Sequence, residues 1–317
     1  MKYAPIVLVV YTRKSNLENL IDSIIANPES KYSDLYIISD APSKEEHKKL
    51  VNEVRDYLKT IEGFNKIELI LPDHNSRKYN IDHVTPIIKF LLDKYGKFIF
   101  LEDDNIVSPH FLRFMNECLE KFKDSKNIGA ICGYSLPIKM PINYQEDIYL
   151  GKRYSPWGMA FRKEWYEKID VSQYDRYSIA IRKENKPKFK DLGLNFLDIL
   201  RLDSLGKIQA HDARICFYHV MNDLYSVFPV KSLVKNVGHD GLGEHSGYTN
   251  RYDVELNMDT DYCLNIDTNV CLNQEILDNF RKFQNKGYYL KYAAKQVLIE
   301  IGLYSFIKSK IRNLTHR

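Results

Sequence analysis

Apolar positions in the first 125 residues follow two alternating spacings. Short runs rich in β-branched residues indicate strands, and longer stretches with apolar residues three or four positions apart indicate helices. Strands are expected at 6–11, 35–39, 67–71 and 98–101. Helices are expected at 17–26, 43–61, 81–95 and 108–123. This regular alternation predicts parallel strands joined by right-handed crossovers.

Two of these helices carry start signals. Ser43-Lys-Glu-Glu46 has the form of a capping box, in which the first and fourth side chains each accept a hydrogen bond from the other residue's backbone N–H. Ser108 and Pro109 suit the N-cap and the first position of the fourth helix. Both signals predict where a helix begins.

Polar residues follow three of the predicted strands, at the point where each strand ends. Thr12-Arg13 follows the first strand, Asp40 the second, and Glu102-Asp103-Asp104 the fourth. In open parallel sheets, ligands bind outside the carboxyl ends of the strands. We therefore expect these residues to lie along one functional edge.

The regular alternation ends after residue 136. Pro137 and Pro141 mark a loop, and residues 172–195 are expected to form a polar, lysine-rich segment outside the regular elements. Residues 194–205 have helical spacing. Residues 233–248 contain four glycines, which predicts a loop with unusual backbone angles.

The acidic turn Glu102-Asp103-Asp104 is the strongest chemical signal. Adjacent carboxylates at the end of a buried strand repel one another unless a cation is shared among them. Mg²⁺ and Mn²⁺ prefer such hard oxygen ligands and leave positions open for phosphate oxygens. The alternative is a solvated acidic turn before the next helix.

Arg13 and Asp40 are candidates for binding a phosphorylated ligand. Arginine can pair with a diphosphate through two parallel hydrogen bonds, although a surface arginine is an equal alternative. Asp40 can accept a hydrogen bond from a base or a ribose hydroxyl. Alternatively, Asp40 shapes the turn before Pro42.

Candidates in the second half of the chain are more scattered. Trp157 next to Gly158 suggests an indole ring over open backbone, as in sugar sites, or else a core tryptophan beside a tight turn. Asp212 is either a general base or a helix N-cap. His245, in the glycine-dense loop, either completes a metal shell or is solvated.

Composition sets broad limits on the function. The chain of 317 residues is 44% hydrophobic and 28% charged, as in ordinary globular proteins. Its five cysteines form no CxxC pair, and the apolar run 5–11 is too short to cross a membrane. We therefore expect a cytoplasmic protein with reduced thiols. No nucleic-acid recognition motif is present.

The C-terminal segment differs in charge from the rest. Residues 281–317 contain nine Lys and Arg against one Glu, whereas residues 1–280 contain 37 basic and 41 acidic residues. Apolar residues at helical spacing within 288–308 predict a basic amphipathic helix. Such a helix either lies on an anionic membrane, at the inner face of the cell membrane, or docks on the domain.

These features together resemble GT-A glycosyltransferases. Within them, the chain is similar to the group of N-acetylglucosaminyltransferases that begin N-glycan branching, with bacterial relatives in surface-polysaccharide synthesis. The resemblance rests on IVLVVYTRKSNLENLIDSI, YIISDAP, KYGKFIFLEDDNIVSPHFLRFMN, SPWGMAFRKEW and PVKSLVKNVGHDGLGEHSG. It implies an α/β fold with a mixed, mainly parallel sheet flanked by helices. It also implies a Rossmann-like nucleotide-sugar half at 1–135, an acceptor half at 136–280 and a helical tail at 281–317.

The resemblance also implies roles for individual residues. Thr12, Arg13 and Asp40 match nucleotide-pocket positions, with Glu102 and Asp103 near the ribose and sugar. Asp104 matches the ligand of a Mn²⁺ or Mg²⁺ ion, and His245 lies in the loop over the donor diphosphate. Trp157 and Gly158 match the segment that shapes the sugar and acceptor pockets. Asp212 matches the catalytic base of an inverting transfer.

The implied activity is metal-dependent transfer of a hexosyl or N-acetylhexosaminyl group. The donor is a nucleotide sugar, and the acceptor is a glycan, such as a lipid-linked oligosaccharide or polysaccharide. A nucleotidyltransferase is the second enzyme hypothesis, although the segment after the first strand lacks the expected glycine-rich loop. A binding module without turnover is the third.

Overall fold

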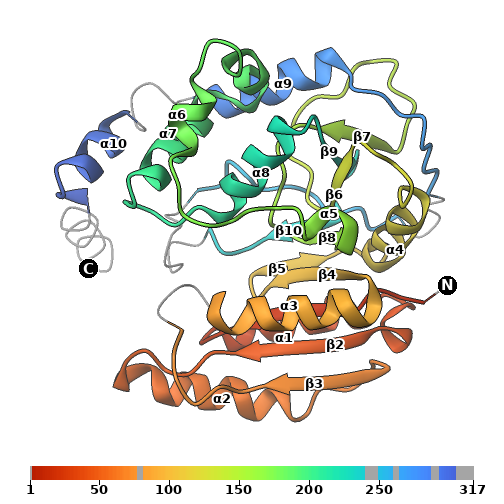
Figure 1. Ribbon diagram of the computed structural model, residues 1–317. Helices are drawn as coiled ribbons and strands as arrows, with labels where there is room; N and C mark the ends of the chain where they lie inside the picture. Colours follow the sequence, from red (N-terminus) through yellow and green to blue (C-terminus); the bar gives the residue numbers. More distant parts are fainter. Residues whose placement is uncertain (1, 77–80, 240–248, 260–263, 287–292, 305–317) are drawn as a thin grey trace. The chain divides into compact units, whose positions relative to one another are not determined.

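The computed structural model describes the whole chain except residues 1, 77–80, 240–248, 260–263, 287–292 and 305–317 (Figure 1). Its main element is an eight-stranded sheet with the order β3-β2-β1-β4-β8-β6-β9-β7. The strands are β1 (Ile6–Val10), β2 (Asp34–Ser39), β3 (Lys66–Ile70), β4 (Lys97–Glu102), β6 (Ile128–Cys132), β7 (Ile148–Gly151), β8 (Met159–Arg162) and β9 (Tyr225–Pro229).

The first four strands form the parallel part of the sheet, as predicted. β1 pairs with β2 on one side and with β4 on the other, and β3 continues the sheet beyond β2. The connecting helices are α1 (Lys14–Ile25), α2 (Lys48–Leu58) and α3 (Ile81–Tyr95). α1 buries Leu17, Leu20, Ile21 and Ile24, the spacing of one helical face.

The remaining strands make the sheet mixed. β8 lies antiparallel between β4 and β6, β9 runs parallel to β6, and β7 is antiparallel to β9. The predicted fold class, a mixed and mainly parallel α/β sheet flanked by helices, is confirmed.

A second, two-stranded sheet extends the acidic turn. β5 (Asn105–Val107) begins directly after Asp104 and pairs antiparallel with β10 (Val234–Asn236). Asn105 lies opposite Asn236 in this ribbon. Asn105 and Asn236, which are 131 positions apart in the sequence, are therefore brought together at the end of β4. The helix α4 (Phe111–Lys121) follows β5.

Both predicted helix starts were wrong in detail. Ser43 forms no capping box; its hydroxyl hydrogen-bonds the Tyr11 hydroxyl, and a short 3₁₀ turn (Glu45–His47) precedes α2. Ser108 lies three residues before α4, where its hydroxyl donates to the Asn257 carbonyl and accepts the His110 N–H. Tertiary hydrogen bonds thus replace the local caps.

The chain divides into two compact units. The first comprises residues 1–137, 142–168 and 225–272, and contains both sheets. The second comprises residues 138–141, 169–224 and 273–317. The expected boundaries at 135, between two halves of one domain, and at 280, before the tail, remain predictions; residue 280 lies inside α9 (Gln274–Asn285).

The second unit is helical in the described residues. Its helices are α6 (Arg176–Ala180), α7 (Leu194–Ser204), α8 (His211–Met221), α9 (Gln274–Asn285) and α10 (Ala293–Glu300). The helix predicted at 194–205 is α7. The polar, lysine-rich segment 172–195 contains α6 and a 3₁₀ helix at Lys186–Leu192.

A buried ion pair stabilises the start of α8. The Arg214 guanidinium donates to both carboxylate oxygens of Asp203, at 2.9 and 2.8 Å. The same carboxylate accepts the Ala210 N–H at 3.0 Å. The pair therefore ties the end of α7 to the residue that precedes α8.

The described cysteines Cys118, Cys132, Cys216 and Cys271 form no disulfide. Within the part of the chain that the structure describes, no helix has the length and apolar content needed to span a membrane.

Candidate functional site

The candidate site lies where the chain order of the parallel strands reverses. From β1 the chain proceeds to β2 and β3 on one side, whereas β4 pairs with the opposite side of β1. Val9 is in register with Glu102, so the segments that follow β1 and β4 leave the sheet next to each other. This is the position at which open α/β sheets bind ligands.

Arg13 joins the two predicted clusters at this edge. Its Nη2 lies 2.9 Å from Asp103 Oδ1 and 3.2 Å from Asp104 Oδ2. The two carboxylate side chains are 10% and 14% exposed, and the guanidinium side chain is 31% exposed. The alternatives of a lone surface arginine and a solvated acidic turn do not describe this arrangement.

Burial of this cluster disfavours the ionised form of Asp103. Burial raises the pKa of Asp103 to about 6, and the neighbouring Asp104 carboxylate adds to the rise. The Arg13 guanidinium and the Tyr11 backbone N–H act in the opposite direction. One guanidinium therefore only partly compensates two adjacent carboxylates.

Asp104 is held in place by the two-stranded ribbon. Its Oδ1 accepts hydrogen bonds from Asn236 Nδ2 at 2.8 Å and from Asn105 Nδ2 at 3.1 Å. Its backbone carbonyl accepts the Val237 N–H at 2.8 Å. A Cβ on Gly238 would lie 2.1 Å from Asp104 Oδ2, so any larger residue there would displace this carboxylate.

Asn105 and Asn236 are not among the site residues predicted from the sequence. Asn105 follows the acidic turn directly and was accessible from the sequence as a polar neighbour. Asn236 is separated from Asp104 by 132 residues, and only the pairing of β5 with β10 reveals it.

Two further predicted residues lie beside the cluster. Glu102 is the last residue of β4, and its backbone N–H donates to Asn105 Oδ1 at 3.2 Å. Thr12 is partly exposed and directly precedes Arg13. Both lie at the expected edge.

Asp40 is buried and already hydrogen-bonded. It accepts the backbone N–H groups of Ala41 at 2.8 Å and Ser76 at 3.1 Å, and the Asn75 side chain at 3.0 Å. Burial raises its pKa despite these bonds. The carboxylate therefore holds the 75–76 segment against the end of β2, which agrees with the turn-shaping alternative.

Trp157 belongs to a cluster of four rings in the first unit. The centroid of its ring lies 4.6 Å from that of Tyr134, 5.3 Å from that of His239 and 5.7 Å from that of Tyr252. His239 follows Gly238, which contacts Asp104. The chain thus connects this aromatic cluster to the acidic turn. Trp157 is partly exposed and is not a core residue.

Gly158 has a packing role. Its φ is +63°, and a Cβ would lie 2.5 Å from Val234 Cγ2. Its carbonyl accepts the Gly133 N–H at 2.7 Å. The need for glycine next to Trp157 therefore follows from close packing against β10.

The other two predicted residues are Asp212 and His245. His245 lies outside the described residues. Asp212 is in the first turn of α8, in the second unit, and Ala210 takes the N-cap position. Its proposed role as a base remains a prediction.

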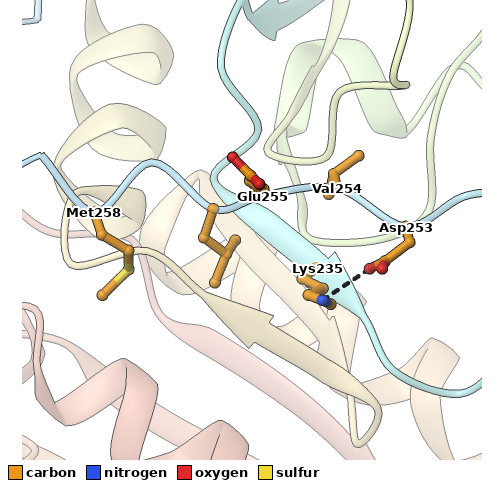
Figure 2. Close-up of a pocket in the computed structure, with 6 residues that line it drawn as sticks. Lys235, Asp253, Val254, Glu255 and Met258 are labelled. Atoms are coloured by element: carbon orange, nitrogen blue, oxygen red, sulfur yellow. Dashed lines mark ion pairs between the residues drawn. The ribbon is translucent and has the colours of Figure 1, made fainter.

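A separate hollow of about 610 Å³ opens on the first unit (Figure 2). Lys235 lines it from β10, and it forms an ion pair with Asp253 at 2.8 Å. Successive side chains of a strand point to opposite faces, so Lys235 and Asn236 project from opposite faces of the ribbon. The hollow is therefore separate from the Asp104 cluster. Its other lining residues are Val254, Glu255, Leu256 and Met258.

No family model and no curated protein matches the chain. Among solved structures, it is similar to S. aureus TarS at 11% identity and a TM-score of 0.41, over 74% of this chain and 36% of that one. For S. aureus TarS 1–349 the identity is 11% and the TM-score 0.40, over 74% and 60% of the chains. For mouse xyloside xylosyltransferase 1 in its apo form the values are 10% and 0.38, over 72% and 84%. At such values the likeness concerns fold alone.

Proposed function

We propose that this chain is a glycosyltransferase that takes its sugar from a nucleotide-sugar donor. The observation that carries the proposal is the cluster of Arg13, Asp103 and Asp104 between the ends of β1 and β4. A guanidinium at a ligand-binding edge is suited to a diphosphate, which it can bind through paired hydrogen bonds.

The acidic pair fits a Mn²⁺ or Mg²⁺ ion that the protein shares with the donor. Such ions are often bound through one or two carboxylates together with substrate phosphates. Among the described residues, no three His, Cys, Asp or Glu side chains are gathered as an all-protein metal cage. Asp104 is the proposed ligand, with Asp103 beside it. The ion would neutralise charge on the departing diphosphate.

The aromatic cluster around Trp157 is the proposed sugar-binding surface. Ring faces offer apolar area, and the polar edges of Trp, Tyr and His can hydrogen-bond hydroxyl groups. The nucleoside would lie toward Thr12 and the end of β2, where Asp40 shapes the backbone. A hexose and an N-acetylhexosamine both fit this description.

We assign the base of an inverting transfer to Asp212. It would take the proton of the acceptor hydroxyl as that oxygen attacks the anomeric carbon and the nucleoside diphosphate leaves. Glu255 is a matched comparison, because it is an exposed carboxylate lining the hollow of the first unit. Asp212→Asn should reduce turnover at least 100-fold and Glu255→Gln less than threefold, since general bases contribute about 10²–10⁴. If Glu255→Gln instead reduces turnover at least 100-fold and Asp212→Asn less than threefold, the base is Glu255 in the hollow and not Asp212.

The acceptor is proposed to be a glycan, in lipid-linked form. The lipid-linked form is supported by the basic C-terminal segment, which suits an anionic membrane surface. The nucleotidyltransferase alternative predicts release of pyrophosphate from a nucleoside triphosphate. The binding-module alternative predicts donor binding without product.

A thermal-shift panel tests the donor site. Nucleoside diphosphates and nucleotide sugars are added with and without Mn²⁺ to wild type, Asp104→Ala and Asp253→Ala. A ligand that binds the native state raises the melting temperature. One nucleotide class should stabilise wild type and Asp253→Ala in the presence of Mn²⁺, and Asp104→Ala should not respond. The Asp253 variant controls for the loss of a carboxylate elsewhere in the first unit. No response to any nucleotide would overturn the donor-site proposal.

A further inference from the structure

We propose that Arg13 is the counter-ion of the acidic pair when no metal is bound, and that it makes binding of metal and diphosphate cooperative. When both ligands arrive, the metal replaces the guanidinium at the carboxylates and Arg13 pairs with the diphosphate. This inference rests on the proposed function.

The hydrogen bonds around Asp104 show for which carboxylate oxygen Arg13 and a metal ion would compete. Oδ1 accepts two amide groups, from Asn105 and Asn236. Oδ2 is the oxygen that Arg13 contacts at 3.2 Å. The two asparagines fix the orientation of the carboxylate. A cation that binds through Oδ2 would therefore occupy the place that the guanidinium holds.

The same nitrogen of Arg13 contacts the second carboxylate. Nη2 lies 2.9 Å from Asp103 Oδ1, so a single NH₂ group of the guanidinium donates to both acids. A metal ion shared by Asp103 and Asp104 would therefore compete with Arg13 for both partners at once.

The balance of charge explains why two ligands are needed. A divalent cation alone meets two carboxylates but is repelled by the guanidinium. A diphosphate alone meets the guanidinium but is repelled by the carboxylates. Together they provide each group with an opposite charge, so each ligand should tighten the binding of the other, by a factor of about 5–150.

The position of Arg13 allows the exchange. It lies at the N-cap of α1, before the first helical turn, and its side chain is 31% exposed. A long side chain at such a position can turn toward solvent without a backbone change. The N-terminus of α1, at which Arg13 lies, also favours an anion.

The test measures Mn²⁺ binding from the electron paramagnetic resonance signal of free Mn²⁺, with and without inorganic pyrophosphate, after correction for the Mn²⁺ that pyrophosphate binds in protein-free samples. Wild type should bind Mn²⁺ at least fivefold more tightly when pyrophosphate is present. Arg13→Gln should bind Mn²⁺ alone at least fivefold more tightly than wild type and lose most of the pyrophosphate effect. Arg13→Lys keeps the positive charge and should bind Mn²⁺ alone as weakly as wild type.

The control is Lys14→Gln, which removes the same charge one residue away. Lys14 is exposed and pairs with Glu18 at 3.4 Å, away from the acidic turn. Lys14→Gln should bind Mn²⁺ as wild type does, both with and without pyrophosphate. If Arg13→Gln binds Mn²⁺ alone no more tightly than Lys14→Gln, Arg13 is not the counter-ion.

Asp104→Ala separates this inference from the proposed function. If Mn²⁺ binds equally well to Asp104→Ala and to wild type, the metal site itself is wrong and both proposals fail. If binding requires Asp104 but is indifferent to Arg13, only the counter-ion role fails.

Discussion

His219 illustrates at the scale of one residue how burial decides protonation. It is fully buried on α8, and burial lowers its pKa to about 3. The imidazole is therefore neutral in the folded protein at pH values where the unfolded chain, with a pKa of about 6.5, takes up a proton. Its contribution to stability is complete above pH 6.5 and is lost as the pH falls toward 3.

We predict that this histidine makes the protein less stable in mild acid. Between pH 7.5 and 5.5 it should remove about 1.4 kcal/mol from the free energy of unfolding. His219→Gln should lack this component, whereas His74→Gln, at an exposed histidine, should retain it. Urea unfolding at the two pH values measures the difference. Equal pH dependence in wild type and His219→Gln would contradict the prediction.

At the scale of elements, the predicted bounds of the strands and helices of the parallel part lie within three residues of the observed ones, except at the start of α2, which lies five residues after the predicted start. The predicted strand 67–71 and helix 81–95 correspond to β3 (Lys66–Ile70) and α3 (Ile81–Tyr95). These follow from local periodicity, because one buried face requires apolar residues at the period of the element. The starts of α2 and α4 were wrong because Ser43 and Ser108 have partners distant in the sequence.

The contact between Gly158 and β10 can be tested as a pair. A Cβ at Gly158 would lie 2.5 Å from Val234 Cγ2, and the φ of +63° disfavours any side chain. Gly158→Ala should cost about 2–4 kcal/mol of stability, through overpacking and backbone strain together. In a Val234→Ala background the cost should decrease, because the 2.5 Å contact is removed, while the backbone strain and the contacts with Phe111 Cε2 at 3.1 Å and Leu101 Cδ2 at 3.3 Å remain.

Gly96→Ala is the matched control for this prediction. Gly96 has a φ of +70°, and no atom lies within 4 Å of a Cβ built there. Chemical denaturation should therefore report strain alone, about 1 kcal/mol. If Gly158→Ala costs no more than Gly96→Ala, the packing explanation for Gly158 is wrong.

At the scale of the whole molecule, charge is unevenly divided between the two units. The second unit has 19 Lys and Arg against 11 Asp and Glu, a net charge of +8, whereas the first has 27 against 31, a net charge of −4. Val297 and Ile301 at the end of α10 are 55% and 58% exposed. An ion pair between Arg201 and Glu300 joins α10 to α7. Exposed aliphatic groups on a basic unit suit an anionic membrane surface.

We predict that the full chain sediments with vesicles containing phosphatidylglycerol and not with vesicles of phosphatidylcholine alone. Val297→Ser with Ile301→Ser should weaken this binding at least fivefold, because apolar area is lost from the contact. Ile142→Ser changes an aliphatic residue that is 99% exposed in the first unit and should have no effect. Equal sedimentation of all three proteins would exclude α10 as the contact.

The sequence by itself determined the parallel strands, their connecting helices and the edge at which Arg13, Asp103 and Asp104 meet. Backbone sterics and one-sided burial act over a few residues, so the periodic pattern contains this information. Only the tertiary structure decided that β8 lies between β4 and β6, that Asn236 holds Asp104, and that Trp157 joins three other rings. These contacts join segments far apart in the sequence, and they depend on how the whole first unit packs.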